Sequence, residues 1–314
     1  MTLTTDTSNL LDRARALTPL IEAEAERSEV LGTMAPAIID AVADSGLFGI
    51  LVPAELGGLE ADLVTSLAVF EELAYADGST GWSTMANATT SCFAAIYTGD
   101  EAVATMFGAG SSVHAGMLGP MGEATPVDGG FLVSGRYQFG SGSGHADWIG
   151  AGVMETVDGE PAVSELGLPA MRVMFLRREQ AEFLGNWDVM GLAGTGSYDY
   201  VVDQVEVPEA FSFLLLEASP RRGGPIFNVG LFALTAVIAG QPFFVQTSHP
   251  TAIDYIYFSF VTMTTVGYGD YTSALNVGRM LAVLEAIFGQ LYLITVVSLV
   301  VQNLSTKRQR QRGD

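Results

Sequence analysis

The residues best suited to chemistry lie near the C-terminal end, where residues 264–270 have the sequence TTVGYGD. An ion filter must turn successive carbonyl oxygens toward one axis, so that they replace the water around the ion. Glycine reaches the backbone angles this requires, because it has no Cβ to clash. We therefore predict a potassium-selective filter made of Thr265, Val266, Gly267, Tyr268 and Gly269. Oxygens of its first four residues would bind K⁺, and Asp270 would place a carboxylate at the outer mouth.

The segments before and after this motif indicate how it is held. Pro250 suits the first turn of a short helix that ends near the filter, because the missing N–H of proline is not needed there. A helix this short cannot cross a bilayer, so we expect a re-entrant pore helix and filter over 251–270. The 22 residues 280–301 contain one charge. At ~1.5 Å per residue they would span ~33 Å, enough for a hydrocarbon core of ~30 Å. They are the expected inner helix.

The stretch 226–245 has no charged residue, but it contains Gly230, Gly240 and Pro242. It is either the outer membrane helix of the same module or a core helix of a soluble domain. Glycine and proline weaken a helix in either case.

The sequences DYIYFSFVTMTTVGYGD and GRMLAVLEAIFGQLYLITVV resemble the two-transmembrane pore module of potassium channels, over about 241–303. The resemblance implies a homotetramer around one pore in a lipid bilayer, with K⁺ as the permeant ion. Basic residues follow the inner helix at Lys307, Arg308, Arg310 and Arg312, and Arg221 and Arg222 precede the outer one. By the positive-inside rule, we expect a multi-pass membrane protein with both termini in the cytoplasm.

Charge divides the chain into two parts. Residues 1–240 hold 9 basic and 31 acidic side chains, a net charge of −22, whereas residues 241–314 hold 5 and 4, a net charge of +1. The acidic part would repel phosphates, so no nucleic-acid partner is expected. With one cysteine, Cys92, and three histidines, the chain has no metal-ligand spacing. We expect Cys92 to be a buried thiol.

Hydrophobic periodicity predicts two kinds of structure in the acidic part. Residues 8–108 have apolar residues at three- and four-residue spacing, which is typical of amphipathic helices. From about residue 111, short segments rich in β-branched and aromatic residues alternate with turn residues, and the Asp-Gly-Gly of VDGGFLVSG predicts a hairpin. The order predicts a helical subdomain followed by a β-barrel or sandwich subdomain.

Four segments of this part occur in the order and spacing of one enzyme family: LFGILVPAELGGLEADL, EELAYADGSTGW, VDGGFLVSGRYQFGSGSGHADW and WDVMGLAGTGSYDYVVDQVEVPE. They resemble the acyl-CoA dehydrogenase superfamily over about 11–240, and its flavin-dependent monooxygenase branch in particular. The resemblance implies a helical domain, a β-barrel and a C-terminal four-helix domain, with flavin between the last two. It ends near Gly240, so weak binding of FAD or FMN and no turnover are expected.

The same resemblance implies which residues face the flavin. Phe139 and Ser141 match the positions where the barrel presents an aromatic ring and a hydroxyl group. Thr195 and Ser197 belong to a Gly-Thr-Gly-Ser turn that lines the same cleft. Each of these could instead be a packing or turn residue, and the histidines at 114 and 145 could be hydrogen-bonded structural groups or catalysts. No residue is assigned a catalytic role.

The predicted organisation is therefore a multidomain chain. Its parts are a helical acyl-CoA dehydrogenase-like domain at 1–110, a β-barrel domain at 111–224, a pore module at 225–303 and a basic cytoplasmic tail at 304–314. The leading interpretation is a potassium channel pore fused to a truncated flavin domain, and enzymatic activity is left open. The alternatives are a flavin-dependent oxidoreductase with an aberrant C-terminus, and a gene chimera in which neither half works.

Overall fold

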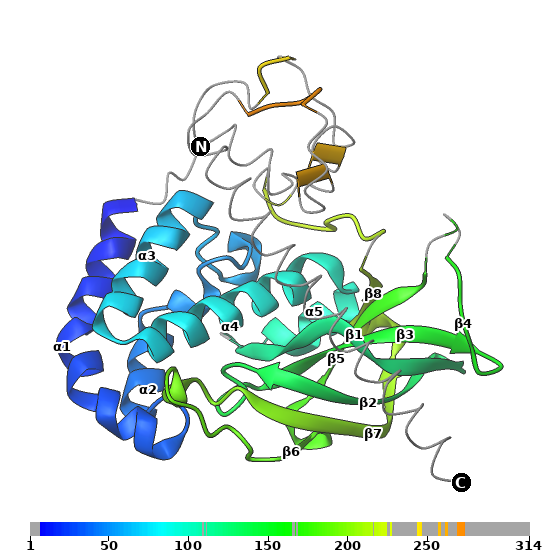
Figure 1. Ribbon diagram of the computed structural model, residues 1–314, viewed down its shortest axis with the longest axis horizontal. Helices are drawn as coiled ribbons and strands as arrows, with labels where there is room; N and C mark the ends of the chain where they lie inside the picture. The colour runs from blue at the N-terminus through cyan, green and yellow to red at the C-terminus, as the bar shows by residue number, and fades with distance from the viewer. Residues whose placement is uncertain are drawn as a thin grey trace, which may run out of the picture. The chain divides into compact units, whose positions relative to one another are not determined.

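The structure of the chain is a computed structural model with two compact units, Met1–Asn228 and Val229–Asp314 (Figure 1). It describes residues 7–108, 110, 112–164, 167, 169–215, 217–224, 227, 244–246, 257–258, 261–262 and 269–273. The domain boundaries expected from the sequence remain predictions.

The first unit begins with a helical layer, as the periodicity predicts. Its α-helices are α1 (Thr7–Leu31), α2 (Pro36–Asp44), α3 (Leu63–Ala76), α4 (Gly78–Tyr97) and α5 (Asp100–Phe107), and its 3₁₀ turns include η1 (Leu47–Gly49) and η2 (Ala54–Leu56). Asp77 separates α3 from α4, because its extended backbone ends one helix and its side chain caps the next by accepting a hydrogen bond from the Thr80 N–H. This cap fixes where α4 begins.

The second half of the unit is a sheet beside these helices (Figure 1). The strands are β1 (His114–Val127), β2 (Gly130–Gly140), β3 (Trp148–Val157), β4 (Glu160–Pro161), β5 (Met171–Arg177), β6 (Glu182–Phe183), β7 (Tyr198–Pro208) and β8 (Ser212–Leu214). Further 3₁₀ turns are η3 (Arg178–Gln180), η4 (Ala193–Thr195) and η5 (Glu209–Phe211). β1 and β2 form the predicted hairpin, because Val127 pairs with Gly130 across a two-residue turn.

Within the described residues the sheet is open and mixed, so the predicted β-barrel is wrong. The strand order is β6-β7-β2-β1-β3-β5-β8, with β4 paired to β3, and β1 runs parallel to β3 whereas the other pairs are antiparallel. Closure would require β6 and β8 to pair, but they are edge strands of two and three residues. Edges this short also leave little unpaired backbone exposed.

Aromatic packing fixes the centre of the sheet. The rings of Tyr137 and Tyr200 stack with centroids 4.8 Å apart, and both side chains are fully buried. The Tyr200 hydroxyl donates to the Gly150 carbonyl at 2.6 Å and accepts from the Met117 N–H at 2.8 Å. Burial raises the pKa of Tyr200 above its usual range, so this hydroxyl stays protonated and can hold β1 and β3 together.

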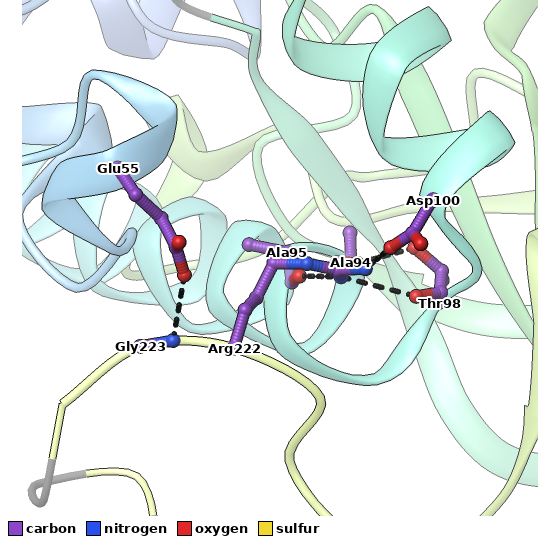
Figure 2. A network of polar contacts seen from close by, with 7 residues as sticks. All are labelled: Glu55, Ala94, Ala95, Thr98, Asp100, Arg222 and Gly223. Carbon is purple, nitrogen blue, oxygen red and sulfur yellow. Dashed lines mark hydrogen bonds and ion pairs between the residues drawn. The ribbon is translucent and has the colours of Figure 1, made fainter.

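The last described segment of the first unit is tied to its helices (Figure 2). Arg222 extends to the end of α4, where its guanidinium donates to the carbonyls of Ala95 and Thr98. The same guanidinium pairs with Asp100, and the N–H of Gly223 donates to a Glu55 carboxylate oxygen at 2.9 Å. The segment thereby caps α4, whose last carbonyls have no partner within the helix.

Described residues of the second unit form a small polar and aromatic cluster. The Tyr257 hydroxyl donates to Asp270 at 2.7 Å, and the Gln246 side chain exchanges two hydrogen bonds with Thr272. The Phe244 ring lies edge-on to that of Tyr271, at 4.9 Å between centroids. The predicted pore-mouth residue is therefore fixed by a residue thirteen positions earlier.

Within the part of the chain that the structure describes, no helix combines the length and apolar character that membrane crossing needs. The predicted inner helix, filter residues 265–268 and basic tail lie outside the described residues, as does most of the predicted outer helix. These assignments remain predictions.

Candidate functional site

Three of the four predicted flavin-facing residues come together. Ser141 follows β2, Thr195 closes η4, and Ser197 precedes β7. The oxygens of Ser141 and Ser197 are 2.7 Å apart, and those of Ser197 and Thr195 are also 2.7 Å apart. We call these three residues the hydroxyl cluster.

The hydrogen bonds around the hydroxyl cluster leave one arrangement of protons. The indole N–H of Trp82 donates to Ser141 Oγ at 3.0 Å, and the Thr195 hydroxyl donates to the Leu192 carbonyl at 2.9 Å. Each hydroxyl has one proton. Ser197 must therefore donate to Thr195, and Ser141 must donate to Ser197. The chain thus runs in one direction from the indole to the carbonyl.

This direction determines what the hydroxyl cluster offers a ligand. Every hydroxyl proton is already used, whereas Ser141 Oγ keeps a free lone pair. Thr195 and Ser197 are buried, and Ser141 is half-buried, so Ser141 is the member that a ligand can reach. The hydroxyl cluster is therefore an acceptor for a ligand N–H or O–H.

The fourth predicted residue, Phe139, lies beside the hydroxyl cluster and not in it. Its backbone has a φ of +62°, and its side chain is 56% exposed. Its ring meets that of Trp187 edge-on at 6.2 Å, and the Trp187 N–H donates to the same Leu192 carbonyl that receives the Thr195 hydroxyl. Trp82, which donates to Ser141, is 47% exposed. We call Phe139, Trp187 and Trp82 the aromatic rim, because each is linked to the hydroxyl cluster or to its final acceptor, the Leu192 carbonyl.

The sequence did not indicate Trp82 as a site residue. It lies 59 positions before Ser141, within α4. The sequence shows only that Trp82 lies in a predicted helix. That its face of the helix remains exposed is known only from the fold.

A polar layer lies behind the hydroxyl cluster. The Gly142 N–H donates to the Thr195 carbonyl at 2.9 Å, which joins the two loops that carry the hydroxyls. The Arg178 Nε–H donates to the Ser143 carbonyl at 2.8 Å. The start of the loop between β2 and β3 is therefore held by two different segments of the chain.

Of the two histidines of the first unit, His114 is fully buried and His145 is half-buried. Burial lowers the pKa of His114 to about 3, and burial together with the Arg178 charge lowers the pKa of His145 to about 4. Both rings are therefore neutral at pH 7. His114 Nδ1 lies 3.1 Å from Ser91 Oγ, and His145 Nε2 lies 3.0 Å from Asn87 Oδ1, which are structural contacts.

A pocket of about 740 Å³ lies elsewhere in the first unit, and its lining includes Tyr97, Arg172, Glu209, Phe213 and Arg221. None of its lining residues belongs to the hydroxyl cluster or the aromatic rim. The volume of this pocket therefore does not make it the candidate site. The hydroxyl cluster is preferred, because the direction of its hydrogen bonds defines which ligand groups it can bind.

Comparisons with known proteins find relatives of the first unit. Residues 6–111 match the family model of the acyl-CoA dehydrogenase N-terminal domain. Indole-3-acetate monooxygenase from Pseudomonas putida is 35% identical over 192 residues, which cover 61% of this chain and 47% of that protein. The oxygenase subunit HsaA of a flavin-dependent monooxygenase from Mycobacterium tuberculosis is 30% identical over 270 residues, covering 85% of this chain and 63% of the relative.

Solved structures extend the similarity to the fold. The HsaA monooxygenase from M. tuberculosis superposes with a TM-score of 0.61 at 30% identity, covering 66% of this chain and 55% of that one. XiaF from Streptomyces sp., in complex with FADH2 and glycerol, gives a TM-score of 0.64 over 83% of this chain and 63% of its own at 21% identity, which shows a shared fold. The enzyme-like part thus resembles acyl-CoA dehydrogenase-like flavin-dependent monooxygenases.

Two further findings concern the coverage of the relatives and the remainder of the chain. The chain spans about half the length of the curated relatives it matches. Residues 231–306 match a family model described as an ion channel, and most of these residues lie outside the described part. The comparisons therefore support the flavin-enzyme alternative better than the leading channel interpretation.

Proposed function

We propose that the first unit binds reduced flavin, FADH2 or FMNH2, and acts as the oxygenase part of a flavin-dependent monooxygenase on an aromatic substrate. The observation that carries the proposal is the direction of the hydroxyl chain, which leaves Ser141 Oγ as an acceptor. Reduced flavin has an N–H at N5, whereas oxidised flavin has a bare nitrogen there. An acceptor at this position therefore favours the reduced form.

The residues present fit a flavin. In the aromatic rim, the exposed side chains of Phe139 and Trp82 could cover a planar isoalloxazine, and the hydroxyl cluster lies next to them. When bound, reduced flavin would supply the electrons for a reaction that converts O2 and substrate into hydroxylated substrate and water.

In this proposal, the residues of the chain bind and orient. Ser141 Oγ would accept the flavin N–H, and Trp82 and Ser197 would hold Ser141 in place. Thr195 would keep the hydroxyl protons pointing away from the ligand. Phe139 and Trp187 would exclude water from one face of the ring. The aromatic substrate class rests on the names of the relatives.

Anaerobic titration of the full-length chain with reduced and with oxidised FMN tests the proposal. We expect the reduced form to bind about fivefold more tightly, because one hydrogen bond contributes about 1 kcal/mol and ~1.4 kcal/mol is a factor of ten. Ser141→Ala should remove most of this preference. Ser45→Ala, whose hydroxyl donates to Val42 within the α2 region, is the matched control. Equal affinity for both redox forms, or no binding of reduced flavin, would refute the proposal.

A second variant tests the direction of the hydroxyl chain. Thr195→Val keeps the side-chain shape but removes the final donor, so Ser197 and Ser141 become free to reverse their protons. Ser141 can then donate to the bare N5 of oxidised flavin. We expect affinity for oxidised flavin to rise relative to reduced flavin, and an unchanged ratio would contradict the derived direction.

A second candidate function, a potassium pore formed by four copies, is supported by the ion-channel match at 231–306. The contact between Tyr257 and Asp270 supports it too, because it ties the end of the TTVGYGD motif to the segment expected to be the pore helix. Bilayer recording of the full-length chain in asymmetric KCl and NaCl tests this function. A reversal potential that ignores the potassium gradient would reject it.

A further inference from the structure

We propose that Asn87 is a positioning residue for the hydroxyl cluster, an inference that rests on the proposed function. Asn87 lies on the buried face of α4 and is fully buried. Its Nδ2 donates to the His114 carbonyl at 2.9 Å and lies 3.5 Å from the Gly142 carbonyl. Its Oδ1 is 3.0 Å from His145 Nε2. One side chain therefore joins α4, the start of β1 and the loop that carries Ser141.

The amide orientation of Asn87 follows from its partners. Both carbonyls require a donor, so the NH2 group faces them and Oδ1 faces His145. His145 must then carry its proton on Nε2. This assigns the tautomer of a neutral ring and gives the loop a second fixed point.

Asn87 acts on Ser141 through the next residue. Gly142 has a φ of +71°, and a Cβ built there would lie 2.5 Å from Asn87 Oδ1. The Asn87 amide therefore packs directly against the Gly142 backbone. The Gly142 N–H in turn donates to the Thr195 carbonyl. The backbone next to Ser141 is thus held between α4 and the turn that supplies the other two hydroxyls.

Asn87 can position Ser141 without touching a ligand itself. Asn87 has no exposed surface, so it cannot touch a flavin on the aromatic rim. Its removal should move Ser141 relative to Trp82 and thereby weaken the acceptor. A residue that only stabilised the fold would not change the Trp82–Ser141 hydrogen bond selectively.

Three variants of the full-length chain test the inference. Asn87→Leu has a similar volume and makes no hydrogen bonds, and Asn87→Asp keeps the acceptor for His145 but loses both donors. Thr90→Val is the matched control, because Thr90 is buried one turn further along α4 and its hydroxyl donates only to Ala86 of the same helix. The measurements are affinity for reduced FMN, the indole ¹⁵N resonance of Trp82 and the titration of His145. The chain has three tryptophans and three histidines, so these signals can be assigned.

We expect Asn87→Leu to shift the Trp82 indole resonance and to weaken the binding of reduced FMN about fivefold, the size of one lost hydrogen bond at the flavin. Asn87→Asp should do both and should also raise the pKa of His145, because a carboxylate stabilises the imidazolium. Thr90→Val should change none of these.

An unchanged Trp82 resonance together with reduced-FMN affinity within twofold of wild type in Asn87→Leu would overturn the inference. If Asn87→Leu does not fold, the same two signals in Asn87→Asp decide. If the wild-type chain binds no reduced flavin, the proposed function fails. The Trp82 resonance then decides alone: a shift in Asn87→Leu supports a positioning role, and its absence refutes one.

Discussion

Replacement of Arg222 by alanine should destabilise the first unit by about 3 kcal/mol, on the scale of charged hydrogen bonds. The Arg222 side chain is only 9% exposed, and it donates to two carbonyls at the end of α4 (Figure 2). Those carbonyls have no partner within the helix, and a positive charge there is favourable. Asp100, the third partner of Arg222, is 98% exposed.

The magnitude follows from the two hydrogen bonds that Arg222 donates to carbonyls at the end of α4. A hydrogen bond from a charged donor contributes about 1.5–3 kcal/mol, and Arg222 makes two such bonds to carbonyls. Water that reaches the freed carbonyls in the variant offsets part of the loss, which gives about 3 kcal/mol. The exposed ion pair with Asp100 contributes little, because solvent screens it.

Urea unfolding of the full-length chain, followed by tryptophan fluorescence, measures the effect. All three tryptophans lie in the first unit, so the signal reports on that unit. With an m-value of about 2 kcal/mol/M, the midpoint should fall by about 1.5 M in Arg222→Ala. Arg222→Lys should show an intermediate loss, because an ammonium lacks the planar fork of the guanidinium.

Asp100→Asn is the control and should leave the midpoint unchanged. If it costs as much as Arg222→Ala, the exposed ion pair is what stabilises the unit and the helix-end argument is wrong. A loss below about 1 kcal/mol in Arg222→Ala would show that the carbonyls are solvated equally well without the cap.

Three further predictions concern the two candidate sites. Gly142→Ala should cost more stability than Gly129→Ala in the same urea assay, because both have a φ near +75° but only the Cβ at 142 meets a neighbour, Asn87. Burial lowers the pKa of His145 to about 4, so the unfolded chain binds more protons than the folded chain between pH 6.5 and 4. The free energy of unfolding should therefore fall as the pH falls through this range. The fall should be less steep in His145→Gln. Gly267→Ala should abolish potassium selectivity in bilayer recordings while membrane insertion is retained, and unchanged currents would show that this loop is not the filter.

Local sequence patterns predicted much of the fold of the first unit. The helices follow apolar spacing, and the β1–β2 hairpin follows from a two-residue turn between strand formers. Sheet closure was predicted wrongly, because it depends on pairing between distant strands. The parallel pair β1–β3 and the short edge strands have no local signature.

The candidate site was predictable only in part for the same reason. Ser141, Thr195 and Ser197 lie in recognisable loops, and the structure brings them together. Trp82 and Asn87 were missed, because their contacts span between 27 and 59 positions. A signal was present on α4, where Asn87 is one of a series of polar residues on the buried face of an otherwise apolar helix. Buried polar groups need partners, so such a series points to a layer of specific contacts.

The two candidate functions can be tested separately because their residues do not overlap. The hydroxyl cluster, the aromatic rim and Asn87 all lie in the first unit, and the hydrogen bonds described for them involve no residue beyond 199. The filter motif and the Tyr257–Asp270 contact lie in the second unit. Ser141→Ala should therefore affect flavin binding without changing conduction, and Gly267→Ala should affect conduction without changing flavin binding. An effect of either variant on the other function would show that the two units are coupled.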